Sequence, residues 1–146
     1  VNAPGMAKSR GIKIKEVKMK ETDNFANLIK VRVTTDKDYC CVKGTLFGNE
    51  GRIVMINDYR VDFVPKGWLM IGPHIDRPGM IGKVGTILGS RGINIASMQV
   101  GRSEKAGNQM MVLAVESVIP QDVLEQLKAV DGILNATMVT FESLSI

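Results

Sequence analysis

The sequence predicts an α+β protein in two parts: a small, mostly antiparallel β domain with a short N-terminal helix, then a ferredoxin-like domain of order β-α-β-β-α-β. Two observations support this prediction. Apolar residues recur at every second position through much of residues 12–66, which is typical of half-buried strands. After Pro65-Lys66-Gly67, short apolar runs alternate with a helical periodicity. We therefore place one domain at residues 1–66 and the other at residues 67–146.

The N-terminal domain is expected to be a helix followed by strands. Asn2 and Pro4 form a helix start signal, and Gly11 is the matching stop signal. Residues 29–34 alternate apolar and polar side chains, which predicts a half-buried strand, and Asn57-Asp58 is a hairpin turn between two further apolar runs. These elements are too few for an independent core. We therefore expect this domain to be incomplete and to complete its core with sequence upstream.

The C-terminal domain follows from its alternating periodicities. Strands are predicted at residues 67–73, 93–102, 109–116 and 133–142. The first helix is expected to begin near Pro78 and to end at Gly89, and the second to begin at Pro120. Gly82 and Gly85 lie inside the first helix and cost about 1 kcal/mol each relative to alanine. We expect a sheet or a neighbouring subunit to pack closely there.

The strand at residues 109–116, QMMVLAVE, is apolar on both faces. Two helices can cover only one face of a four-stranded sheet, so something else must bury the other. The sequence leaves two possibilities, a second copy of the chain or the N-terminal half. We favour the second copy and therefore expect a homo-oligomer.

Composition excludes several classes of function. The 146-residue chain has a formal net charge of +4, and its basic residues gather near the N-terminus in KIKEVKMKE without aromatic neighbours. A solvated strand edge explains this run better than a nucleic-acid surface. Cys40 and Cys41 would point to opposite faces of a strand, and His74 is the sole histidine, so neither a disulfide nor a metal site is expected.

The same reasoning gives an expected location. The chain contains no signal peptide and no apolar run near the roughly 20 residues that span a bilayer. We expect a cytoplasmic protein with no membrane partner. Since the chain begins with Val1, we expect a piece cut from a longer protein.

The hexapeptide HIDRPG, residues 74–79, predicts a binding site between a strand and a helix. The first amide groups of a helix have no partners within it and attract a carboxylate. Gly79 lets a small anion approach the backbone, and Asp76 supplies the complementary negative charge for an ammonium group. His74 and Asn94 add hydrogen-bonding groups. This set of residues suits a zwitterionic amino acid with a small polar side chain.

Each of these residues also has a simpler interpretation. Asp76 is at a position where an acid often only caps the helix. His74 could be a surface residue at a strand end, and Asn94 could satisfy the backbone of the turn after the helix. Arg77 is most simply a solvated surface charge.

Two stretches resemble a known family. HIDRPGMIGKVGTILGSRGINIASMQVGR, with the strand, helix and strand that follow, resembles an ACT domain, specifically that of the D-3-phosphoglycerate dehydrogenases. The opening VNAPGMAKSRGIKIKE is similar to the intervening, allosteric-substrate-binding-like domain of the longer bacterial enzymes. The resemblance implies a regulatory fragment of an NAD-dependent enzyme that oxidises 3-phosphoglycerate in the first step of L-serine biosynthesis.

The resemblance also implies site residues and partners. L-serine would bind where the ACT domains of two subunits pair edge to edge, and each site would take residues from both chains. The implied serine contacts are His74, Asp76 and Asn94, with backbone groups of Gly79, Met80 and Ile81. Arg52 and Arg60 are candidates for a second anion site in the intervening domain.

The catalytic features of such an enzyme are not expected in this chain. No GxGxxG follows a strand, and the glycines at 79, 82 and 85 are spaced by three within a helix. We therefore expect no catalytic residues and no cofactor here, with NAD bound elsewhere in the parent enzyme. Two alternatives are a regulatory subunit of an iron–sulfur L-serine dehydratase and a free-standing amino-acid-binding ACT regulator.

Overall fold

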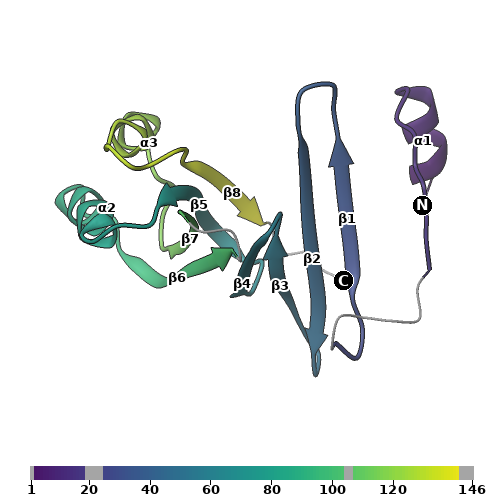
Figure 1. Cartoon of the computed structure of the whole chain (residues 1–146), viewed down its shortest axis with the longest axis horizontal. Helices are drawn as coiled ribbons and strands as arrows, with labels where there is room; N and C mark the ends of the chain where they lie inside the picture. Colours follow the sequence, from purple (N-terminus) through teal and green to yellow (C-terminus); the bar gives the residue numbers. More distant parts are fainter. Residues whose placement is uncertain (1, 19–24, 104–106, 142–146) are drawn as a thin grey trace.

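A computed structural model describes residues 2–18, 25–103 and 107–141 (Figure 1). Its helices are α1 (Ala3–Ser9), α2 (Met80–Ser90) and α3 (Gln121–Lys128). Its strands are β1 (Ile29–Thr34), β2 (Tyr39–Phe47), β3 (Glu50–Ile56), β4 (Tyr59–Phe63), β5 (Gly67–Ile75), β6 (Ile95–Ser103), β7 (Asn108–Val115) and β8 (Thr137–Phe141). The α+β class is therefore confirmed.

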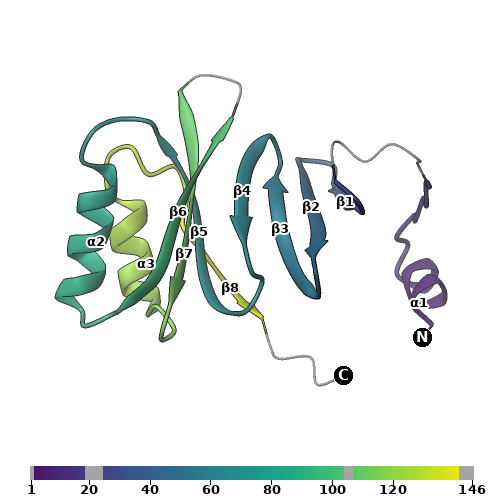
Figure 2. The ribbon, with the colours of Figure 1, turned by 90° about the horizontal axis from the view of Figure 1, so that it is seen from below.

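All eight strands belong to one antiparallel sheet of order β1-β2-β3-β4-β6-β7-β5-β8. The last four strands in this order form the ferredoxin-like part, and α2 and α3 cover one of its faces (Figure 2). β5 and β6 run parallel to each other, because each is antiparallel to β7. α2 therefore runs from the end of β5 back to the beginning of β6.

The main core lies between α2, α3 and the sheet. Val84 and Leu88 of α2 and Val123 of α3 are fully buried, as is Leu113 of β7. Burial of each such side chain contributes roughly 1.5–3 kcal/mol. The helical stripes predicted from the sequence thus hold both helices on the sheet.

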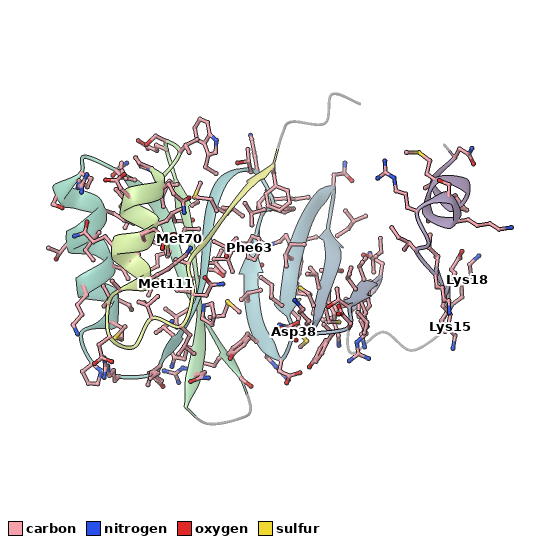
Figure 3. The ribbon with its side chains drawn as sticks, turned by 90° about the horizontal axis from the view of Figure 1, so that it is seen from above. Lys15, Lys18, Asp38, Phe63, Met70 and Met111 are labelled. Carbon is pink, nitrogen blue, oxygen red and sulfur yellow. The ribbon has the colours of Figure 1, made fainter. Side chains whose placement is uncertain are left out.

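The opposite face of the ferredoxin-like sheet is covered by the N-terminal half. Met110 and Val112 of β7 share a buried cluster with Ile56, Val61 and Phe63 of β3 and β4. Figure 3 labels Phe63 of this cluster, and Met70 and Met111 of the cluster under the helices. Our preference for a second copy as the cover of this face was wrong, because strands of the same chain bury it.

β4 joins the two halves by pairing with the outer edge of β6. Arg60 is directly opposite Arg102 in this ladder, and the Asp62 amide donates a hydrogen bond to the Gln99 side chain over 2.9 Å. Gly101 lies against the Arg60 backbone and has no room for a side chain. The close approach of β4 to β6 therefore depends on a glycine at position 101.

β1 forms where the alternation predicted a strand, but its predicted half-burial is wrong. Ile29, Val31 and Val33 are 72%, 56% and 58% exposed, and β1 is the outermost strand of the sheet. No other described strand packs on this face. Completion of this domain by upstream sequence stays a prediction.

The N-terminal segment lies apart from the sheet. α1 has Pro4 in its first turn, Gly11 follows it with φ 69°, and none of its residues is buried. The basic stretch after it was interpreted as a strand edge, but residues 13–18 are exposed and belong to no strand. Figure 3 shows Lys15 and Lys18 of this stretch at a distance from the sheet, and its last part, residues 19–21, lies outside the described residues.

Several predicted boundaries shift. β5 continues past the expected end at residue 73 to Ile75, and β8 begins at Thr137 instead of residue 133. Glu142, the expected end of β8, and residues 104–106 of the predicted β6–β7 turn lie outside the described residues. Cys40 is exposed and Cys41 buried, so the two cysteines point to opposite faces as predicted. Within the described ranges, no helix is both long and apolar enough to cross a membrane.

Candidate functional site

His74 is buried near the end of β5. Along a strand every second side chain points to the same face, so His74 shares a face with Met70. Met70 belongs to the core under α2 and α3, and His74 therefore lies on the face that these helices cover. Its exposed fraction is 2%, so the interpretation as a surface residue at a strand end was wrong. The ring atom Nδ1 is buried and has no hydrogen-bond partner among the described residues. A buried polar atom in this state is uncommon in a folded protein.

The N-terminus of α2 lies just beyond this histidine. The helix begins at Met80, two residues later than predicted, after Gly79, whose φ of 85° favours glycine. The first bond of the helix runs from the Lys83 amide to the Gly79 carbonyl, so the amides of residues 80–82 have no partner within the helix. No side chain caps α2, so the interpretation of Asp76 as a cap was wrong.

Hydrogen bonds fix the loop between β5 and α2. The amides of Ile75 and Asp76 donate to the carbonyls of Gly132 and Gly107 over 2.8 and 2.9 Å. Arg77 forms an ion pair with Asp131, with 2.6 Å between Nη2 and Oδ2, so it is not merely a solvated charge as we had interpreted it. The hydrogen bond from Arg77 lowers the pKa of the Asp131 carboxyl below its ordinary value of 3.8.

Asn94 lies far from His74 within one chain. It precedes β6, and its carbonyl accepts a hydrogen bond from the Glu116 amide at the opposite end of the sheet. The 11 residues of α2 separate the two ends, which corresponds to roughly 16 Å of helix. The Asn94 side chain is exposed and has no hydrogen-bond partner within the described part, which argues against a role in the turn. The predicted site residues between positions 74 and 81 therefore lie together, whereas Asn94 of the same chain lies apart from them.

The two arginines proposed for a second anion site have different surroundings. Arg52 donates to Asp62 over 2.5 Å and to Glu50 over 2.8 Å, and the hydrogen bond to Asp62 contributes most to raising its pKa. Arg60 instead lines a cavity of about 730 Å³ together with Lys43. The remaining lining residues are Phe25, Phe47, Val54, Met55, Val61 and Asp62.

Some residues of these sites were missed by sequence reasoning. Lys43 is on the same sheet face as Arg60, because both residues pair with Met55. Pairing the predicted strands with one another would have identified Lys43 as a neighbour of Arg60. Asp131 and Gly132 were not among the residues predicted for the site. Both residues contact the loop at residues 75–77. Arg77 and Asp131 are 54 residues apart in the sequence, so no local sequence pattern could have predicted their contact.

Gly82 and Gly85 leave an open face on α2. A Cβ atom built at either position meets nothing within 4 Å, so the sheet of this chain does not approach them. Ile81 on the same helix is 49% exposed. Of the two explanations given for these glycines, close packing by the chain's own sheet was wrong, and a neighbouring subunit stays a prediction.

Comparison with known families finds matches to two separate parts of the chain. Residues 1–57 match the D-3-phosphoglycerate dehydrogenase intervening domain, and residues 74–132 match the ACT domain. The boundary predicted between residues 66 and 67 lies between these matches and stays a prediction.

Proteins named D-3-phosphoglycerate dehydrogenase are similar over nearly the whole chain. The one from Archaeoglobus fulgidus is 44% identical over 141 residues, which is 95% of this chain and 27% of that protein. Those from Methanocaldococcus jannaschii and Bacillus subtilis are each 40% identical, over 95% of this chain and 26% and 27% of their own lengths. The chain spans about a quarter of the length of these relatives. It is homologous to the C-terminal region of the D-3-phosphoglycerate dehydrogenases and combines their intervening domain with an ACT domain.

Proposed function

We propose that this chain is the regulatory, amino-acid-sensing end of a D-3-phosphoglycerate dehydrogenase and that it binds L-serine. The rest of the enzyme would oxidise 3-phosphoglycerate with NAD, and serine would act as a feedback signal. One observation carries the proposal: His74 is 2% exposed, with Nδ1 unpartnered among the described residues, beside the uncapped start of α2. A ligand that hydrogen-bonds to Nδ1 would remove the cost of leaving it unsatisfied.

The groups around His74 match the three polar groups of serine. The amides of residues 80–82 suit its carboxylate, because they lack helical partners and lie at the positive end of the α2 dipole. The exposed carboxylate of Asp76 suits its ammonium group. His74 Nδ1 suits the hydroxyl, which can donate or accept a hydrogen bond.

A complete site requires two copies of the chain. Asn94 is at the wrong end of α2 to reach a ligand at His74 of the same chain. A two-fold axis that sets two α2 helices antiparallel would bring Asn94 of one copy toward Met80 of the other. β4 occupies the outer edge of β6 near Arg102 and Ser103, so the copies would meet through the Ile95 end of β6 and the open face of α2.

Regulation would follow from the difference in serine affinity between arrangements of the paired domains. Serine that binds across two copies favours the arrangement in which both halves of the site are close. The active site in the rest of the enzyme would respond only to the extent that its activity differs between these arrangements.

The two alternative functions receive less support. The family that matches residues 1–57 is the intervening domain of D-3-phosphoglycerate dehydrogenase, which favours the dehydrogenase over both alternatives. The relatives that cover 95% of the chain carry the dehydrogenase name. A small ligand is expected of an ACT domain under each alternative.

A second anion site has support at Arg60 but not at Arg52. Lys43 and Arg60 line the same cavity, and Arg52 is not among the residues that line it. We propose the cavity as the site of a small phosphorylated or carboxylated anion. Phosphate should bind more weakly to a Lys43→Ala variant than to the unaltered chain. An Arg52→Ala variant is the control and should bind phosphate normally, and an equal loss of phosphate binding in this variant would contradict a site in the cavity.

Calorimetry with L-serine tests the main proposal. Heat of binding is expected for L-serine at concentrations up to millimolar, with weaker binding of L-alanine, which lacks the hydroxyl group. His74→Phe, which keeps a ring of similar size without Nδ1, should remove this preference for serine. Absence of binding heat with the unaltered chain, confirmed by an unchanged melting temperature, would refute serine binding.

A further inference from the structure

Arg77 and Asp131 connect the loop before α2 to the turn after α3. The Arg77 guanidinium donates to both the backbone carbonyl and the carboxylate of Asp131. Both hydrogen bonds leave from Nη2, whose two N–H groups serve one acceptor each, and the bond to the carboxylate is charge-assisted. Close by, the amide of Ile75 donates to the carbonyl of Gly132 over 2.8 Å. Two side-chain hydrogen bonds and one backbone hydrogen bond therefore join residues 75–77 to the turn at residues 131–132.

Gly132 makes this contact possible. Its φ of 99° is a conformation that side chains rarely adopt. A Cβ atom there would also lie 2.8 Å from Nη2 of Arg77 and 3.0 Å from the Met80 sulfur. Met80 is the first residue of α2 and is 2% exposed. Arg77, Gly132 and Met80 are thus packed together, and displacement of the guanidinium would disturb the beginning of α2.

We propose that Arg77 and Asp131 are positioning residues for the amino-acid site, which hold the amides at the start of α2 in place before the ligand arrives. This inference rests on the proposed serine binding. Without the ion pair, ordering of the loop would oppose binding, and the affinity would fall. Both hydrogen bonds to Asp131 leave from Nη2 of Arg77, and in this proposal Arg77 holds the loop without contacting the ligand.

The test compares L-serine affinity across variants of the whole 146-residue chain. Asp131→Asn keeps the size of the side chain and the backbone carbonyl but removes the charge, and Gly132→Ala keeps both charges but crowds the guanidinium. Both variants should weaken serine binding by about three- to tenfold. Arg77→Lys keeps the charge but not the planar guanidinium. Its serine affinity should therefore lie between that of Arg77→Ala and that of the unaltered chain.

A second ion pair between the same helices is a matched control. Arg91 and Asp122 lie 3.0 Å apart and join the C-terminal end of α2 to the beginning of α3. Asp122→Asn should change the melting temperature to a similar degree as Asp131→Asn, without weakening serine binding. The size of each oligomer is measured alongside, so that loss of pairing is recognised.

The outcomes separate this inference from the proposed function. If the unaltered chain does not bind serine, both are overturned. If serine binds with equal affinity to the unaltered chain and to folded Asp131→Asn and Gly132→Ala, only the positioning role is overturned. A loss of affinity in Arg77→Ala without any loss in Asp131→Asn would also overturn it, because Arg77 would then contact the ligand directly.

Discussion

Gly101 of β6 lies directly against the carbonyl oxygen of Arg60 of β4, and a Cβ atom at position 101 would be well inside van der Waals contact with it. This contact is where the strands of the N-terminal half continue into the ferredoxin-like part of the sheet. The same atom would also crowd the Val61 side chain, which belongs to the core shared by the two halves.

The first prediction concerns this junction. Gly101→Ala should reduce the free energy of unfolding by about 1–3 kcal/mol, because β4 must move away from β6. Urea unfolding followed by circular dichroism measures the change. If the variant has unaltered stability, β4 does not pair with β6 in solution.

The second prediction concerns the open face of α2. Gly82→Ala should stabilise a single chain by up to about 1 kcal/mol, because alanine favours the helix and meets no neighbouring atom. If α2 packs against a second copy, the same change should weaken that pairing. Sedimentation over a range of concentrations gives the pairing affinity, and unfolding of a diluted sample gives the stability. A variant that gains stability and pairs normally would remove this face from the proposed interface.

The third prediction concerns sharing of the serine site. Asn94→Ala should weaken serine binding by about 1–3 kcal/mol, the usual penalty for an unpaired polar partner. Equal amounts of Asn94→Ala and His74→Phe chains, unfolded and refolded together, should recover strong binding at about a quarter of the sites, because random pairing makes half of the dimers mixed. Each mixed dimer has one intact site out of two. No recovery in the mixture would mean that both residues act within one chain.

The fourth prediction concerns acid stability. Arg77, and to a lesser extent Lys83, lower the pKa of Asp131, so the native state favours the ionised carboxyl. This group stabilises the fold above its ordinary pKa of 3.8, and the contribution is lost as the pH falls through the lowered native value. Asp131→Asn should be less stable than the unaltered chain at neutral pH, and the difference should disappear in acid. A difference that stays constant from neutral to acidic pH would show that the charge is not its cause.

Periodicity predicted most of the fold, because the pattern of side chains along a helix or strand is local. The stripe that includes Val84 and Leu88 and the turn at Asn57-Asp58 are where the sequence indicated. Burial of β1 was not predictable, because alternation shows that a strand has an apolar face but not that something covers it. Burial of Met110 and Val112 depends on how the sheet continues past β6 into β4 and β3, and no short segment of sequence encodes that path.

The candidate site divides in the same manner. His74, Asp76 and Gly79 are close in sequence, and their proximity followed from the break between strand and helix. The burial of His74 depended on two more residues of strand than the sequence indicated. Asn94 seemed near because the sequence does not show that a helix carries the chain to the far end of the sheet.

The outermost strand has a consequence for handling the isolated polypeptide. Among the described strands, none pairs with the outer edge of β1, whose residues include the exposed Ile29, Val31 and Val33. Open strand edges recruit strands from other molecules and promote aggregation. If two identical β1 strands met antiparallel about Val31, Lys30 of one would oppose Arg32 of the other, and their repulsion resists growth by self-addition. Substitution of Lys30 and Arg32 by neutral residues should lower the concentration at which the protein precipitates.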